Sequence, residues 1–221
     1  MERIADAVER EADVRVIARN VALAGNLFVP REAKGIVVFA HGSGSGRNSP
    51  RNRFVARALQ ERGLGTLLFD LLTVAEEAVD SHTTEFRFDI SLLADRLTGA
   101  TDWLTELTAA RSLKTGYFGA STGAAAALIA ASRRPESISA IVSRGGRPDM
   151  AGDALARVRA PVLLIVGSRD NPTISINQRA LDKLNVEKEL VLIPGATHLF
   201  EEPGALEEVA RLAGRWFVDH F

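Results

Sequence analysis

The chain has 221 residues, 46% of them hydrophobic and 25% charged, and its formal net charge is −1. These values are ordinary for a packed globular protein and argue against a nucleic-acid or membrane-surface partner, and no stretch approaches the roughly 18 apolar residues of a membrane span. The absence of cysteine excludes disulfides, thiolate catalysis and cysteine-bound metals. Together with a charged first segment that lacks the apolar core of a signal peptide, it favours a cytoplasmic location.

Short apolar segments predict eight strands. The first two alternate apolar and polar residues, as half-exposed antiparallel strands do. The later ones are nearly continuous apolar runs, which is typical of parallel strands covered on both faces. In chain order, the predicted strands span residues 14–18, 21–29, 35–40, 65–70, 115–120, 138–143, 161–167 and 189–194.

Helical patterns separate these strands. One begins with Ser49 as N-cap and Pro50 at the first helical position, and ends near Gly63. Others cover residues 88–110, 121–135 and 203–221. This alternation predicts an α/β fold, namely a doubly wound, mostly parallel eight-stranded sheet with an N-terminal antiparallel hairpin. We expect a single domain over residues 1–221, with residues 1–12 disordered or loosely attached.

The interval between the sixth and seventh predicted strands is too short to hold an inserted helical lid. The loop over residues 71–86 is therefore the main cover available to a site, which favours a small or accessible substrate. Within this loop, Glu76, Glu77 and Asp80 are interpreted as a solvated loop face rather than as metal ligands. No HExxH or comparable metal spacing occurs, and neither a metal nor a cofactor is expected.

Three candidate catalytic residues follow predicted strands, and ligands of such sheets bind at the carboxyl ends of the strands. Ser121 follows the fifth strand between Gly119 and Gly123, Asp170 follows the seventh, and His198 follows the eighth. The chain order Ser, Asp, His is the one used by α/β-hydrolases. Each piece alone is a weak signal, but their conjunction predicts a catalytic triad.

A serine hydroxyl is a poor nucleophile unless a base accepts its proton, and His198 is the predicted base. Asp170 would orient the imidazole and stabilise its protonated form, with Asp149 as the alternative acid because it also follows a strand. The backbone N–H groups of Ser43 and Thr122 are the predicted oxyanion donors.

Other strand-end residues have two interpretations. Arg47, Arg144 and Arg147 either bind an anionic group of the substrate or form salt bridges with nearby carboxylates. His41, which precedes the "GSGSG" segment, is interpreted as a residue that orients the oxyanion loop.

The segments "HGSGSGR", "GASTG", "LLIVGSRD" and "IPGATHLF" resemble the α/β-hydrolase superfamily, and the lidless form resembles its dienelactone hydrolase-like branch. The resemblance runs from about residue 14 to the C-terminus. "FDLLT", "SRGGRPD" and "HLFEEPGAL" also resemble a bacterial subgroup that is sometimes fused to a phosphoribosyltransferase domain. The better-known dienelactone hydrolases use a cysteine nucleophile, which this chain lacks, so dienelactone is not the expected substrate.

The sequence therefore predicts a serine hydrolase that cleaves a small ester, thioester or lactone through an acyl-enzyme. One alternative is a non-catalytic hydrolase-fold module, such as a regulatory partner of a nucleotide-metabolism enzyme. Another is an acyltransferase or peptidase with the same triad. The expected partner is a small ester-type molecule, without nucleic acid or membrane, and a homo-oligomer is compatible with the sequence.

Overall fold

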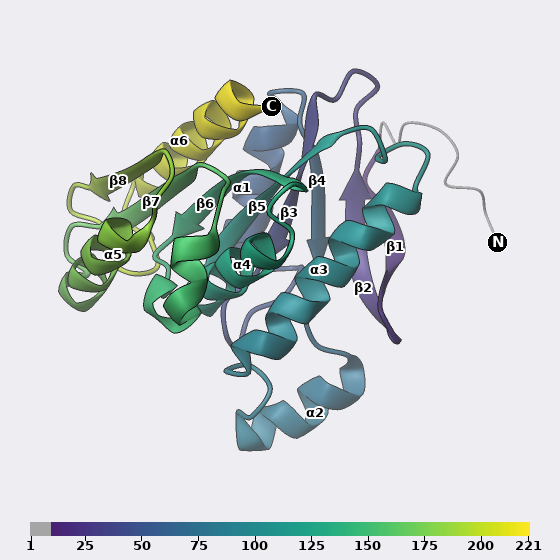
Figure 1. Cartoon of the computed structure of the whole chain (residues 1–221), viewed down its shortest axis with the longest axis horizontal. Coiled ribbons are helices and arrows are strands. Elements are labelled where there is room, and N and C mark those ends of the chain that lie inside the picture. Colours follow the sequence, from purple (N-terminus) through teal and green to yellow (C-terminus); the bar gives the residue numbers. More distant parts are fainter. Residues whose placement is uncertain (1–9) are drawn as a thin grey trace.

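The computed structural model describes residues 10–221 (Figure 1). Its first strand begins at Ala12. The expectation that residues 1–12 are disordered or loosely attached therefore lies mostly outside the described residues.

A single mixed sheet contains all eight predicted strands, and each observed boundary falls within two residues of the predicted one. The strand order is β1-β2-β4-β3-β5-β6-β7-β8. Strand β2 is antiparallel to both of its neighbours, and every other pairing is parallel. The strands are β1 (Ala12–Ala18), β2 (Val21–Phe28), β3 (Gly35–Ala40), β4 (Gly65–Phe69), β5 (Lys114–Ala120), β6 (Ile138–Arg144), β7 (Val162–Gly167) and β8 (Lys188–Ile193).

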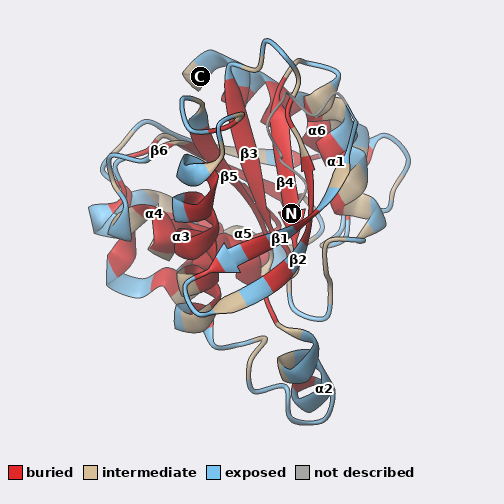
Figure 2. Ribbon diagram, turned by 90° about the vertical axis from the view of Figure 1, so that its right-hand side faces the viewer, coloured by how far each residue is buried: buried red, intermediate tan, exposed pale blue. Residues whose placement is uncertain are grey.

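The burial of the strands explains their sequence patterns. Every residue of β3, β4 and β7 is buried, which is why these strands read as continuous apolar runs. Strand β1 lies at one edge of the sheet and alternates buried with exposed residues. The doubly wound sheet with its antiparallel start is therefore confirmed (Figure 2).

Helices cover both faces of the sheet (Figure 1). Two separate clusters of buried apolar residues fill the space between helices and sheet. On one face lie α1 (Pro50–Gln60) and α6 (Ala205–His220). The other face holds α3 (Ile90–Glu106), α4 (Thr122–Arg133), the 3₁₀ segment η1 (Pro148–Arg157) and α5 (Asn171–Lys183). Within residues 10–221, no helix has the length and apolar character needed to cross a membrane.

The segment expected to be a loop over residues 71–86 contains a helix, α2 (Val74–Thr83), which lies apart from both helical layers (Figures 1 and 2). It begins with a capping box, in which the Thr73 hydroxyl accepts from the N–H of Glu76 and the Glu76 carboxylate accepts from the N–H of Thr73. Its only buried residue is Asp80, so it lacks the apolar periodicity from which a helix is usually recognised.

The acidic residues of α2 do not all form a solvated face, which corrects the sequence interpretation. Glu76 pairs with the guanidinium of Arg96 on α3. Asp80 is 1% exposed and accepts hydrogen bonds from the N–H groups of Phe86 and Arg87 and from the Arg87 guanidinium. These carboxylates attach α2 to the body of the protein by polar contacts.

Candidate active site

Ser121 stands on a strained turn between β5 and α4. Its φ of +50° and ψ of −121° are rarely adopted by a residue with a side chain, at a cost of about 1–3 kcal/mol. Backbone hydrogen bonds hold it there: its N–H donates to the carbonyl of Arg144 (3.2 Å), and its carbonyl accepts from the N–H groups of Ala124 and Arg147 (both 3.1 Å). The turn is the strand-to-helix corner expected of an exposed nucleophile.

The two glycines that flank Ser121 are required by close approaches of the backbone. A Cβ atom at Gly123 would lie 2.2 Å from the carbonyl oxygen of Ala40, at the end of β3. A Cβ atom at Gly119 would lie 2.4 Å from the Cα atom of Ala124, in the first turn of α4. Glycine at both positions lets α4 begin directly against the sheet.

Asp170 and His198 are in direct contact. The Nδ1 atom of His198 lies 2.7 Å from Oδ2 of Asp170. A carboxylate accepts at this distance, so Nδ1 carries the proton and Nε2 is free to act as a base. The Asp170 side chain is 10% exposed and the His198 side chain 41% exposed, so the carboxylate is sheltered while the imidazole remains accessible.

The alternative acid, Asp149, is placed elsewhere. Its carboxylate accepts two hydrogen bonds from the Arg147 guanidinium, from Nε at 2.9 Å and from Nη2 at 2.8 Å. The Asp149 side chain is 36% exposed, and these bonds hold its pKa below the ordinary value. The structure thus brings Asp170, and not Asp149, to His198.

The end of β6 connects the turn at Ser121 with the loop that contains His198. The carbonyl of Arg144 receives the Ser121 N–H, and the next residue, Gly145, has a φ of +52° and lies against His198. A Cβ atom on Gly145 would lie 3.5 Å from Cε1 of His198. No hydrogen bond joins Ser121 to His198 among the described residues, and such contacts often tighten only when substrate binds.

His41 anchors the loop over residues 42–46, the candidate oxyanion loop, to the segment that follows β4. Its Nε2 atom accepts from the N–H of Leu71 at 3.0 Å, so Nδ1 is protonated and donates to the carbonyl of Gly42, also at 3.0 Å. Burial lowers the pKa of His41 below its ordinary value, which favours this neutral form. This arrangement matches the orienting position suggested from the sequence.

Ser43 and Thr122 lie together beside Ser121. A Cβ atom on Gly42, which precedes Ser43, would lie 3.1 Å from the Cβ atom of Ser121. The N–H of Ser43 donates to Oγ1 of Thr122 at 3.0 Å, and Thr122 is only 3% exposed. The backbone N–H of Ser43, which is expected to bind the oxyanion, is therefore close to Ser121. In this structure it donates its hydrogen bond to the Thr122 hydroxyl instead.

Two of the three arginines considered as anion contacts are neutralised by carboxylates. Arg47 donates to Asp70 through its backbone N–H (2.8 Å) and Nε (3.2 Å), and to Asn26 through Nη1 (2.8 Å). Arg147 is paired with Asp149, as described above. Both therefore make the contacts of the salt-bridge interpretation. Arg144 is 8% exposed, and its Nε and Nη1 atoms have no hydrogen-bond partner within residues 10–221.

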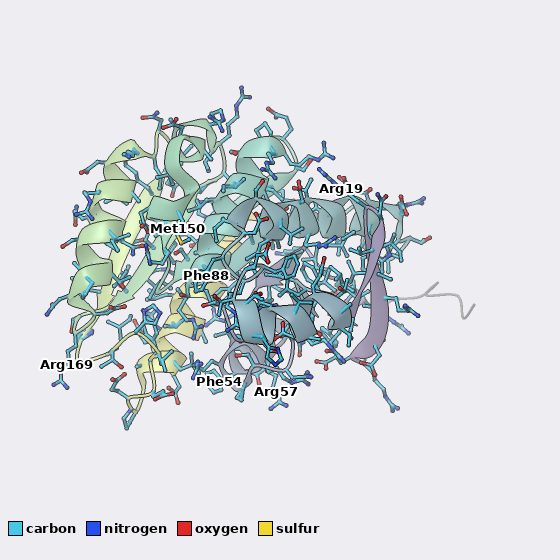
Figure 3. The ribbon with its side chains drawn as sticks, turned by 90° about the horizontal axis from the view of Figure 1, so that it is seen from below. Arg19, Phe54, Arg57, Phe88, Met150 and Arg169 are labelled. Atoms are coloured by element: carbon cyan, nitrogen blue, oxygen red, sulfur yellow. The ribbon has the colours of Figure 1, made fainter. Side chains whose placement is uncertain are left out.

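A further arginine next to the candidate triad in sequence, Arg169, is exposed and points outward at the edge of the molecule (Figure 3). It precedes Asp170 in the chain, but its side chain projects away from the body of the protein. We therefore do not place it in the candidate site.

An open cleft of about 840 Å³ extends from the oxyanion loop. Its walls are residues 43–46 of that loop, residues 48–51 at the start of α1, and one side of α2. Ser121, Asp170 and His198 do not line it, and the cleft reaches the candidate site through Ser43, which follows the residue that packs against Ser121. The sequence analysis did not predict helix α2 and therefore missed this side of the cleft. The capping box formed by Thr73 and Glu76 was the sequence signal that could have revealed the helix.

The chain is similar to proteins of known family. A model of the dienelactone hydrolase family matches residues 23–216. Two proteins named "Putative phosphoribosyl transferase", from Mycobacterium tuberculosis strains CDC 1551 and H37Rv, are each 55% identical over 216 residues. The match covers 98% of this chain and 48% of either relative, so the chain spans about half their length.

Comparison with solved structures also finds similar proteins. A dienelactone hydrolase from Anabaena variabilis superposes with a TM-score of 0.95 at 59% identity, covering 96% of this chain and 98% of that one. Est1E from Butyrivibrio proteoclasticus superposes with a TM-score of 0.78 at 16% identity, covering 94% and 98%. At 16% identity, the similarity to Est1E shows only a shared fold.

Proposed function

Because the chain belongs to the dienelactone hydrolase family and has its α/β-hydrolase fold, we propose that it is a serine hydrolase of small esters, thioesters or lactones. The observation that carries this proposal is the 2.7 Å contact between Asp170 and His198, at the same edge of the sheet as the strained Ser121. A protein that only binds a ligand would not need the buried Asp170 carboxylate to contact the accessible His198 imidazole. It would also not need Ser121 to be held at a positive φ.

In the proposed first half-reaction, Ser121 Oγ attacks the carbonyl carbon while its proton passes to Nε2 of His198. Asp170 stabilises the imidazolium that forms. The carbonyl oxygen becomes an anion and is bound by the N–H groups of Thr122 and Ser43, the latter exchanging its hydrogen bond with the Thr122 hydroxyl. The bond to the leaving group then breaks, and His198 returns its proton to the departing oxygen or sulfur.

In the second half-reaction, water attacks the acyl-enzyme. His198 takes one proton of the water, and the new oxyanion occupies the same two N–H groups. The bond between the acyl carbon and Ser121 Oγ breaks, the proton returns to Oγ, and the carboxylic acid leaves. Each residue ends in its starting state, so the cycle balances.

The surroundings of the triad support a small or polar substrate. The adjacent cleft is open and is lined mainly by serine, threonine, asparagine and charged side chains. Its lining is more polar than apolar, which favours a short or polar substrate over a long acyl chain.

Labelling by a fluorophosphonate tests the proposed nucleophile. The intact protein should be labelled at Ser121, as located by peptide mapping, and Ser121→Ala should not be labelled. A panel of p-nitrophenyl esters from acetate to decanoate, with a thioester, a lactone and dienelactone added, then defines the substrate class. A folded protein that neither reacts with the probe nor hydrolyses any member of the panel would overturn the proposal.

A second candidate is a non-catalytic module that regulates a phosphoribosyltransferase. The observation that favours it is the match to only 48% of the two mycobacterial relatives, which carry that name. It predicts a specific complex with the separately purified remainder of such a relative, and no ester turnover. If the complex forms and the Ser121-dependent activity is unchanged, the chain is an enzyme that also has a protein partner, and the purely regulatory function is wrong.

The same triad also serves acyl transfer and peptide cleavage in principle. Hydrolysis predicts that added alcohols, amines and peptides do not compete with water for the acyl-enzyme. Product analysis with such acceptors present separates these reactions.

A further inference from the structure

Two consecutive residues after β4 hold both ends of the candidate oxyanion loop. The N–H of Leu71 donates to Nε2 of His41, which precedes the loop, at 3.0 Å. The carboxylate of Asp70 accepts from the N–H of Arg47, which follows the loop, at 2.8 Å. These contacts join residues that are 30 and 23 positions apart in the chain, so a distant segment fixes the loop at both ends.

The part of the loop between these two anchors is a tight turn that presents the N–H of Ser43. The N–H of Ser45 donates to the carbonyl of Gly42 at 3.2 Å, and Gly44 has a φ of +68°. This is the pattern of a four-residue turn with Ser43 and Gly44 at its centre. The N–H of Ser43 takes no part in the hydrogen bond of the turn and donates to Oγ1 of Thr122. Its direction therefore depends on how the two ends of the turn are held.

Asp70 holds the downstream end of this turn through both of its carboxylate oxygens. Oδ1 accepts from the backbone N–H of Arg47, and Oδ2 accepts from the Nε atom of the same residue at 3.2 Å. A Cβ atom on Gly46 would lie 2.8 Å from Oδ1 of Asp70, so glycine lets the backbone of the loop approach the carboxylate closely. Hydrogen bonds to an ionised acceptor are stronger than those between neutral groups, which makes this a firm anchor.

Arg47 extends the connection to the N-terminal hairpin. Its Nη1 atom donates to Oδ1 of Asn26 on β2 at 2.8 Å. Asn26 is 7% exposed, and its Nδ2 atom donates to Asp13 on β1 at 2.9 Å. A buried amide is costly unless it is hydrogen-bonded, and here its oxygen is used to fix the Arg47 guanidinium. A continuous chain of hydrogen bonds thus runs from the hairpin through Arg47 to Asp70.

We propose that Asp70, with Arg47 as its partner, is a positioning residue that fixes the direction of the Ser43 N–H for the oxyanion. This inference rests on the proposed hydrolase function and adds two residues that act through Ser43. An oxyanion donor is effective when it is fixed before the charge develops, and a displacement of about 1 Å can cost about 10²-fold in rate. Without Asp70, the turn keeps its anchor at His41 and loses the one at its other end, so the Ser43 N–H gains freedom to turn away.

Steady-state hydrolysis of p-nitrophenyl acetate measures the effect on the reaction. Asp70→Ala should lower kcat about 10- to 100-fold and change KM less than about twofold, because the oxyanion exists in the transition state and not in the bound ester. Asp70→Asn should keep part of the activity, since its amide oxygen can still accept from the N–H of Arg47. Arg47→Gln should lower kcat only about threefold to tenfold, since the backbone N–H at this position remains.

A matched arginine variant controls for the change of charge. Arg53, in the first turn of α1, pairs with Glu11 and makes no printed contact with the loop. Arg53→Gln removes the same charge as Arg47→Gln and should leave kcat and KM near the wild-type values. A loss of kcat in Arg53→Gln equal to that in Arg47→Gln would contradict a specific role for Arg47.

A transition-state analogue separates positioning from a merely structural role. Phenylethyl trifluoromethyl ketone forms a tetrahedral adduct with a serine nucleophile, and its oxyanion requires the same donors as the reaction. Its inhibition constant for Asp70→Ala should rise by about the factor by which kcat/KM falls. A structural role would instead lower Tm and the number of active sites, counted by fluorophosphonate labelling at saturation. The remaining sites would then have the wild-type kcat and inhibition constant.

NMR relaxation of the backbone amides gives a readout that needs no turnover. The Ser43 amide of the wild type should have an order parameter of about 0.85, and Asp70→Ala should lower it below about 0.6 while the amides of β4 stay unchanged. A rigid Ser43 amide in Asp70→Ala, or an unchanged kcat per active site, would overturn the inference. If the wild type is neither labelled nor active on any ester, the hydrolase proposal fails, and the order parameter still decides whether Asp70 holds the Ser43 N–H.

Discussion

The backbone N–H of Ser43 donates a hydrogen bond to the side-chain hydroxyl of Thr122, 3.0 Å away. Both residues are candidate oxyanion donors through their main chains, yet in this structure one donor is bound by the side chain of the other. Formation of the oxyanion must exchange this hydrogen bond for one to the substrate. In the proposed mechanism, the Thr122 hydroxyl therefore competes with the transition state for the N–H of Ser43.

Thr122→Val, which keeps the shape and removes the hydroxyl, should raise kcat for p-nitrophenyl acetate by about two- to tenfold. A hydrogen bond of this kind contributes about 0.5–1.5 kcal/mol net, and its loss makes the Ser43 N–H available. The same substitution should lower the free energy of unfolding by a similar amount. Steady-state kinetics and urea titration measure the two effects.

Thr122→Ser is the matched control, since it keeps the hydroxyl and should resemble the wild type in both measurements. A Thr122→Val enzyme with reduced kcat would contradict the expectation. It would mean that the hydroxyl assists the reaction.

Asp170→Asn should reduce kcat by about 10⁴-fold, the effect known for the equivalent change in a serine protease. The NH2 group of the amide can donate to Nδ1 and so favours the wrong tautomer of His198, and the neutral amide lacks the charge that stabilises the imidazolium. Stopped-flow or steady-state ester hydrolysis measures the loss. Asp149→Asn serves as the comparison and should retain activity, because its partner is Arg147. Equal losses in the two variants would argue against Asp170 as the acid.

Ser121→Gly should be more stable than Ser121→Ala by about 1 kcal/mol, although both should be inactive. Glycine adopts the φ of +50° without the steric cost that alanine shares with serine. Because both substitutions remove the hydroxyl, only the backbone contribution differs between them. Chemical denaturation of the two variants gives the difference directly, and identical midpoints would show that the turn stores no strain.

His41 should make folding stability depend on pH. Burial lowers its pKa in the folded state below the ordinary value of 6.5, so below that pH the unfolded chain binds a proton that the folded protein resists. The wild type should therefore lose stability as the pH falls from about 6.5 through the lowered pKa.

His41→Gln keeps a hydrogen-bond acceptor and a donor but removes this titration. Its stability deficit relative to the wild type should shrink between pH 7 and pH 5, as followed by urea unfolding. A deficit that is constant or grows over this range would show that His41 is not held neutral by burial.

The sheet and the nucleophile turn could be predicted from the sequence because their signals are local. The eight strands were recognisable from apolar runs, and the strand–turn–helix corner from Gly119, Ser121 and Gly123. Helix α2 was missed because it packs through a single buried residue, Asp80, and so shows no apolar stripe. Its capping box was present in the sequence, but such a motif is short.

The sequence by itself determined that Ser121, Asp170 and His198 each follow a predicted strand, because the apolar runs that mark those strands are local signals. Only the tertiary structure showed that Asp170 is the aspartate in contact with His198 and that Arg47 and Arg147 pair with carboxylates. It also showed that the Thr122 hydroxyl accepts a hydrogen bond from the N–H of Ser43. These contacts join residues far apart in the chain: 28 positions for His198 and Asp170, and 79 for Ser43 and Thr122. The physical reason is that periodicity and glycine sterics act between neighbours, whereas the partner of a charge depends on which strand ends the fold brings together.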